Sequence, residues 1–202
     1  GYLSTGSSTI ALGTSGSLSE QADAYVYLGQ VTATESVAQN STGTFGNVGI
    51  SVTPNGNNMG NTDVIRTTGK VVQGNGNGSI KRQFAITPAT NTSLDAEVGF
   101  TYNDDELQAY PENKLDLYKR PKGGAASTWV FLGTPARDAV NNELTITGIN
   151  TFSELSASNG SVSPLPVELE SWDVAYLNGH VRLQWVTASE LNNSHFIVQR
   201  SL

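Results

Sequence analysis

The sequence predicts an all-β protein built mainly as an antiparallel β-sandwich. Charged residues make up only 14% of the 202 residues, and Gly, Ser, Thr and Asn are abundant instead. Short runs rich in β-branched and aromatic residues recur about every 8–15 residues, separated by turn residues. No helical period of apolar residues extends beyond a single turn within Asp105–Tyr110.

Two segments give the clearest strand pattern. From Leu94 to Tyr102 every second residue is apolar, and the residues between them are Asp, Glu, Gly and Thr. This period of two predicts a strand with one buried face. The segment Ile80–Thr87 repeats the pattern, with Ile80, Arg82, Phe84 and Ile86 on one face.

Shorter patterns and turn residues define the other elements of a first domain over residues 1–160. Residues 1–19 read as one or two short strands or as a flexible lead-in. Further strands are expected at Ala24–Thr34, Phe45–Val52, Asp63–Arg66, Gly69–Gln73, Leu115–Lys119, Trp129–Leu132, Glu143–Thr147 and Phe152–Ala157.

A second domain is expected over residues 164–202, after a linker with Pro164 and Pro166. Strands are predicted at Val167–Ala175, Val181–Val186 and Phe196–Gln199. A complete sandwich of the fibronectin or immunoglobulin type needs about seven strands, so this domain reads as incomplete. We expect its apolar face to be covered either by a longer polypeptide or by a strand from a neighbouring copy, which would make a filament or another homo-oligomer.

The second segment resembles the fibronectin-like domain found near the end of many Bacteroidetes surface proteins. The resemblance rests on Leu165–Leu169, Leu183–Asn193 and Phe196–Ser201, in that order and spacing. It implies export by the type IX secretion route and a place on the outer-membrane surface or outside the cell.

Residues 20–157 resemble a module that often precedes that domain in the same exported proteins. Thr44–Gly49, Val64–Gly69, Ile80–Pro88 and Phe100–Leu107 carry this resemblance, together with Leu115–Arg120, Trp129, Thr147–Ile149 and Phe152–Ser153. It implies location and architecture more than activity. Because this module commonly follows β-helical repeats in the proteins it resembles, residues 1–19 are also read as the end of a β-solenoid.

Composition argues against several classes of function. The formal net charge is −7, opposite to that of a protein that binds nucleic acid through phosphates. Cys is absent and only two His are present, which removes thiolate and most histidine chemistry. No apolar run is long enough to span a membrane. A non-catalytic module is therefore expected, with no cofactor.

The densest acidic run is Asp104-Asp105-Glu106, after Asn103. Ca²⁺ binds six to eight hard oxygen ligands, so this run is a candidate calcium site. The alternative is a solvated loop whose Asp residues cap a short helical turn.

Two arginines fall where apolar residues are expected. Arg82 lies between Ile80 and Phe84 on a buried strand face, and Arg66 on its own strand is in a similar position. A buried charge must be paired, and Glu20 and Glu106 are the expected partners. Structural ion pairs are favoured over an anion-binding arginine pair.

These features favour a structural or adhesive module of an exported bacterial protein. The alternative is an adhesin domain that binds a surface glycan or a protein. It would use an exposed aromatic patch or the acidic loop near Asp104–Glu106. The candidate stacking aromatics are Tyr25, Tyr27, Phe100, Tyr102, Trp129 and Phe131.

Overall fold

The structure is a computed structural model that describes every residue except 22, 75–77, 126–127, 161–167, 178 and 190–202. The described part is all-β, apart from the single-turn 3-10 helices η1 (Asp104–Glu106) and η2 (Glu112–Lys114). The strands are β1 (Leu3–Ala11), β2 (Val26–Val37), β3 (Ile50–Pro54), β4 (Gly60–Thr68), β5 (Arg82–Pro88), β6 (Ala96–Thr101), β7 (Leu115–Arg120), β8 (Val130–Gly133), β9 (Ala136–Asp138), β10 (Glu143–Ile149), β11 (Glu154–Asn159), β12 (Glu168–Leu177) and β13 (His180–Ser189).

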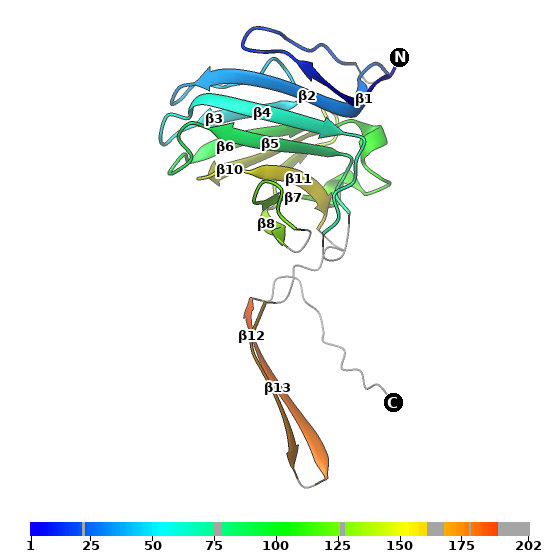
Figure 1. The fold of residues 1–202 in the computed structure, drawn as a ribbon, viewed down its shortest axis with the longest axis vertical. Coiled ribbons are helices and arrows are strands. Elements are labelled where there is room, and N and C mark those ends of the chain that lie inside the picture. The colour runs from blue at the N-terminus through cyan, green and yellow to red at the C-terminus, as the bar shows by residue number, and fades with distance from the viewer. Residues whose placement is uncertain (22, 75–77, 126–127, 161–167, 178, 190–202) are drawn as a thin grey trace.

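Eleven of these strands form two large sheets in a sandwich-like arrangement. The seven-stranded sheet has the order β1-β2-β4-β5-β11-β7-β8, and the four-stranded sheet has the order β3-β6-β10-β9. Figure 1 shows the two sheets as layers, with β4 and β5 in front of β6 and β10. The pairing is antiparallel throughout both sheets except between β1 and β2.

One apolar core fills the space between the sheets. The alternating residues Leu94, Ala96, Val98, Phe100 and Tyr102 are all at most 1% exposed, which confirms the face predicted from their spacing. Phe84 of β5 meets Phe100 of β6 edge to face, with ring centroids 5.1 Å apart, so this aromatic pair joins the sheets at the centre of the core.

The structure corrects several details of the sequence interpretation. β1 pairs with β2 in parallel, whereas an antiparallel sandwich was predicted. The residue pattern of a strand does not specify in which direction the strand pairs with its neighbour. Phe45–Gly49 forms turns, since Phe45, Gly46, Asn47 and Gly49 all have positive φ, which no regular strand allows. Gly69–Gln73 holds only an isolated bridge, and the three-residue strand β9 is an addition to the predicted elements.

β12 and β13 form a separate two-stranded antiparallel hairpin. Cross-strand pairing puts six apolar residues on one face, because Trp172 is opposite Trp185, Val174 opposite Leu183, and Tyr176 opposite Val181. Trp172 is 60% exposed and Tyr176 is 75% exposed. The strand predicted at Phe196–Gln199 lies outside the described residues, as does the linker at residues 161–167.

Candidate functional site

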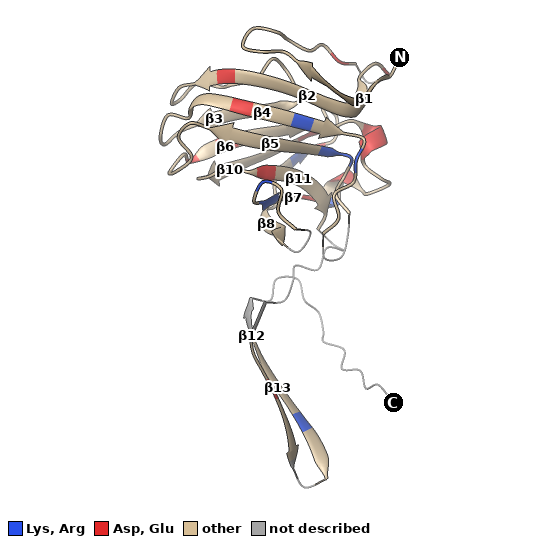
Figure 2. Cartoon of the chain, viewed as in Figure 1, with Lys and Arg blue, Asp and Glu red and all other residues tan. Residues whose placement is uncertain are grey.

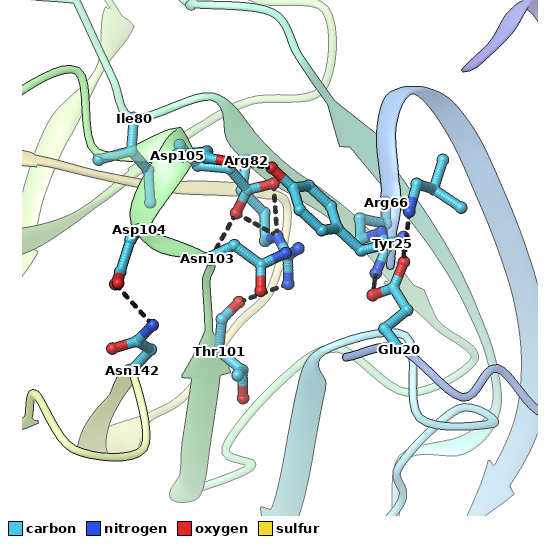
Figure 3. Close-up of polar contacts among 12 residues, drawn as sticks. Glu20, Tyr25, Arg66, Ile80, Arg82, Thr101, Asn103, Asp104, Asp105 and Asn142 are labelled. Atoms are coloured by element: carbon cyan, nitrogen blue, oxygen red, sulfur yellow. Dashed lines mark hydrogen bonds and ion pairs between the residues drawn. The ribbon is translucent and has the colours of Figure 1, made fainter. Parts of the chain in front are cut away.

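Two charged side chains of the seven-stranded sheet point into the sandwich at one end. Figure 2 shows the basic positions on β4 and β5 against sheets that carry few charges, and Figure 3 shows their contacts. Arg66 of β4 is fully buried, and its guanidinium binds Glu20 through two hydrogen bonds of 2.6 and 2.7 Å. Arg66 Nη1 also donates to the carbonyl of Val48, 3.1 Å away, just before β3 of the other sheet.

Arg82 of β5 makes an equivalent set of contacts next to Arg66. Its Nε lies 2.9 Å from Oε2 of Glu106, and both side chains are 2% exposed. Its Nη1 donates to the carbonyl of Thr101 in β6, 2.9 Å away. Glu106 also accepts a hydrogen bond from the backbone N–H of Asn103, which fixes the η1 turn. The structure thus pairs Arg66 and Arg82 with the two acids that the sequence suggested.

Burial governs the ionisation of this cluster. Burial is the largest influence on Glu106 and raises the pKa of its carboxyl group, although the charge of Arg82 opposes the shift. Burial likewise lowers the pKa of the Arg82 guanidinium. For Glu20, burial alone would raise the pKa, but the hydrogen bonds and charge of Arg66 outweigh it and the pKa is lowered. Arg66 therefore favours the ionised form of Glu20 more strongly than Arg82 favours the ionised form of Glu106.

A third arginine joins the sheets at another place. Arg137 of β9, in the four-stranded sheet, donates from Nε to the carbonyl of Leu115, 2.8 Å away in β7 of the larger sheet. Its Nη2 lies 2.7 Å from Oδ1 of Asp116. Sequence reasoning missed this contact because β9 has only three residues and no periodicity. Arg66, Arg82 and Arg137 are called the cross-sheet arginines below.

The acidic run of η1 is held by three different protein contacts. Oδ1 of Asp104 accepts from Asn142, 2.8 Å away, and Oδ2 of Asp105 accepts from the Tyr25 hydroxyl, 3.1 Å away. Glu106 is turned inward to Arg82. Within the described residues, no group of three or more His, Cys, Asp or Glu is placed to hold a metal ion. Calcium binding by Asp104, Asp105 and Glu106 therefore stays a prediction. The three carboxylates contact different protein groups and do not form one set of ligands.

A polar cleft of about 800 Å³ opens beside this cluster. It is lined by residues from four segments of the chain, 18–21, 44–51, 101–103 and 140–142, and by Arg82. Most of the lining side chains are Asn, Gln, Ser or Thr. The only acid among them is Glu20, which is bound to Arg66. The cleft is therefore rich in groups that both donate and accept hydrogen bonds, and its charges are already paired.

Two buried donors at this cleft have no hydrogen-bond partner among the described residues. They are Nη2 of Arg82 and Nδ2 of Asn103. Buried polar groups are nearly always hydrogen-bonded, because an unmade bond costs about 1–3 kcal/mol. Gly49 forms the wall next to Arg82, and a Cβ at Gly49 would lie 2.7 Å from Nη1.

A smaller hollow of about 310 Å³ is lined in part by Asp105 and Glu106 of η1. Tyr2, Tyr25, Tyr27, Lys81 and Asp105 contribute to it, and we call it the tyrosine hollow. Tyr2 is 58% exposed and Tyr27 is 44% exposed. Of the six candidate stacking aromatics, Tyr27 is thus accessible, whereas Tyr25, Phe100, Tyr102 and Trp129 are buried and Phe131 is half-buried.

The comparisons with protein-family models, curated proteins and solved structures found no match to this protein. In the described residues, no helix has the length and apolar character needed to cross a bilayer.

Proposed function

We propose that this protein is a non-catalytic structural module of an exported bacterial cell-surface or extracellular protein. The observation that carries the proposal is the set of cross-sheet arginines. Each starts in one sheet and donates to a backbone carbonyl at or beside the other sheet, at Val48, Thr101 and Leu115. A module that keeps a fixed shape under load needs its two layers bound to each other, and these bonds add to the apolar core.

The paired charges support a non-catalytic role. Glycoside hydrolysis requires two carboxyl groups about 5–10 Å apart that face the same sugar. Among the described residues that line the polar cleft, the only acid is Glu20, and its carboxylate is held by Arg66. Incubation of the protein with a polysaccharide panel is expected to release no reducing ends. Turnover that an acid substitution abolishes would contradict the proposal.

The export of the protein is supported by the resemblance of residues 20–157 and 164–201 to Bacteroidetes surface modules. Intact cells of the source bacterium, treated with proteinase K, should lose the protein from a whole-cell immunoblot while a cytoplasmic marker survives. Protection of the protein until the cells are lysed would refute surface exposure.

The mechanical role is tested by pulling the full-length protein from its ends in single-molecule force spectroscopy. Residues 3–159 should unfold in one event that lengthens the polypeptide by roughly 500 Å, from about 3.3–3.6 Å for each extended residue. Substitution of Arg137 by Ala should lower the unfolding force. Gradual extension in small steps in the wild-type protein would count against a shape-holding module.

A second role, assembly through the hairpin, is favoured by one specific observation. Trp172, Val174, Tyr176 and Val181 are all at least 50% exposed on the apolar face of β12–β13. A two-stranded sheet is marginally stable unless such a face is covered. We infer that further strands of a fibronectin-like sandwich cover it, from the same polypeptide or from a neighbouring copy.

Light scattering separates the two sources of those strands. Self-assembly predicts a mass that rises with concentration and that the double substitution W172S/Y176S reduces to the monomer value. D173N changes the opposite, polar face and should leave the association intact. A wild-type monomer at all concentrations would rule out completion by a neighbouring copy.

A further inference from the structure

We propose that the tyrosine hollow binds a neutral saccharide, with a sugar ring stacked on Tyr27 and a sugar hydroxyl group hydrogen-bonded to Asp105. The proposal goes beyond the shape-holding role and specifies a site and a ligand class for the adhesive alternative. The volume of the hollow is about 310 Å³. Ligand sites usually measure about 300–1,000 Å³, so this hollow suits a short saccharide.

The hollow gathers the exposed aromatic rings of the sandwich. Among the described residues of the segment 1–160, the exposed aromatic side chains are Tyr2, at 58%, and Tyr27, at 44%. The other aromatic side chains described in that segment are buried or half-buried. Single exposed apolar residues are common on protein surfaces, but exposed rings that gather at one hollow indicate a binding surface.

Contacts among the tyrosines hold the rings in place. The Tyr2 ring meets the Tyr25 ring edge to face, with centroids 5.2 Å apart, and lies 6.0 Å from the Tyr27 ring. Tyr25 is 5% exposed, and its hydroxyl donates to Oδ2 of Asp105, 3.1 Å away (Figure 3). The planes of Tyr2 and Tyr27 are 73° apart, so one ring can support the face of a sugar while the other contacts its edge. Rings that are already ordered lose little conformational entropy when a ligand binds.

The charges of the lining favour a neutral ligand. Asp105 is exposed, and Lys81 contributes the opposite charge to the same hollow. Glu106, the third charged residue of the lining, is 2% exposed and paired with Arg82. A cationic ligand would be repelled by Lys81 and an anionic ligand by Asp105, so neither gains from the local charge.

Asp105 gives the hollow an acceptor for a sugar hydroxyl. Its Oδ2 accepts from Tyr25, whereas Oδ1 has no donor among the described residues and the side chain is exposed. A sugar hydroxyl supplies that donor, while the apolar C–H face of the sugar covers an aromatic ring. A proline-rich peptide also occupies aromatic-lined sites, but proline has no N–H group to offer the carboxylate.

The test is an NMR titration of the full-length protein with neutral tetrasaccharides of glucose, xylose, mannose and N-acetylglucosamine. Choline, a tetragalacturonate and decaproline are the cationic, anionic and peptide comparisons. At least one neutral sugar should shift the amide signals of residues 2, 25–28, 69, 81 and 105–106 in a saturable manner and bind more tightly than all three comparisons. Tighter binding of any comparison than of every neutral sugar would overturn the ligand class.

Tyr27 supplies the decisive variants, because its side chain is exposed and not part of the core. Y27A removes the stacked ring and should weaken binding of the best sugar about tenfold, whereas Y27F keeps the ring and should stay within about threefold of the wild type. D105N should weaken binding about three- to tenfold, because it weakens one hydrogen bond. The matched controls outside the hollow, Y176A and D104N, should bind as the wild type does.

A dispersed amide spectrum of Y27A shows that this variant is folded. Equal affinities of the wild type and Y27A would overturn the proposal. So would the absence of saturable shifts at the hollow with every neutral sugar, or shifts confined to another region such as the polar cleft. None of these results bears on the force measurements that test the structural role.

Discussion

Arg82 and Glu106 form an ion pair that is almost completely removed from solvent, with Nε and Oε2 2.9 Å apart and both side chains 2% exposed. Burial raises the pKa of the acid and lowers the pKa of the base, so both shifts oppose the charged forms. The two charges therefore depend on each other: either alone would be an uncompensated charge in the core.

The first prediction follows from this dependence. Glu106→Gln should lower the free energy of unfolding by about 3–5 kcal/mol, because it leaves Arg82 buried without its counter-charge. Denaturant unfolding followed by tryptophan fluorescence measures the change. The matched control is Asp63→Asn on an exposed position of β4, which should change stability by about 0.5 kcal/mol or less. Equal losses of stability in both variants would show that the loss of Glu106 costs no more than the loss of an exposed carboxylate.

Replacement of both members should cost less than replacement of one. The double variant R82M/E106L removes the two charges together and keeps apolar volume, so we expect it to be more stable than Glu106→Gln. A double variant that is less stable than the single one would mean that the bond from Arg82 to the Thr101 carbonyl carries most of the stabilisation.

Glu20 gives a prediction of pH dependence. Its pKa in the folded state is below the ordinary value of 4.5, on balance through the contacts with Arg66. Its contribution to stability is therefore fully present above pH 4.5 and is lost as the pH falls toward the folded pKa. The free energy of unfolding of the wild type should drop more steeply than that of Glu20→Gln between about pH 5 and pH 2. Parallel curves would disprove the shift.

Gly49 and Gly148 form a matched pair for backbone and steric effects. Both have positive φ, 91° and 78°, but a Cβ at Gly148 meets nothing within 4 Å, whereas one at Gly49 meets Arg82 Nη1 at 2.7 Å. Gly148→Ala should cost about 1 kcal/mol, from backbone strain alone. Gly49→Ala should cost at least about 1 kcal/mol more, because the guanidinium must also move. Equal costs would show that Arg82 shifts freely.

The cross-sheet contact of Arg137 is tested by Arg137→Lys. A lysine cannot reach both the Leu115 carbonyl and the Asp116 carboxylate in the way a guanidinium does, so about 1–2 kcal/mol should be lost. Arg182→Lys on the exposed face of β13 is the control and should be silent. An Arg137→Lys variant with the free energy of unfolding of the wild type would show that this contact does not help to hold the sheets together.

Much of the fold could be predicted from the sequence, because it follows from local patterns. The alternation from Leu94 to Tyr102 and from Ile80 to Ile86 places the buried faces correctly, and the charge of Arg82 on such a face required a carboxylate partner. Those inferences need only the period of a strand and the cost of burying a charge.

The remaining features depend on contacts between distant segments. The parallel pairing of β1 with β2 and the contact of Arg137 with Leu115 carry no local signal. The polar cleft is assembled from four regions between residues 18 and 142, so no single motif announces it. The strand predicted at Phe45–Val52 is wrong in its first half. Its support was the alternation of Val48, Ile50 and Val52, but positive φ angles before Ile50 confine β3 to Ile50–Pro54.

The acceptors used by the cross-sheet arginines have a consequence for how this protein tolerates variation. A backbone carbonyl is present in every amino acid, so residues 48, 101 and 115 can be exchanged for others without removing the oxygen that each guanidinium binds. A saturation library should therefore accept only other apolar residues at the buried positions 48 and 115, a wider range at the half-buried position 101, and very few at positions 66, 82 and 137.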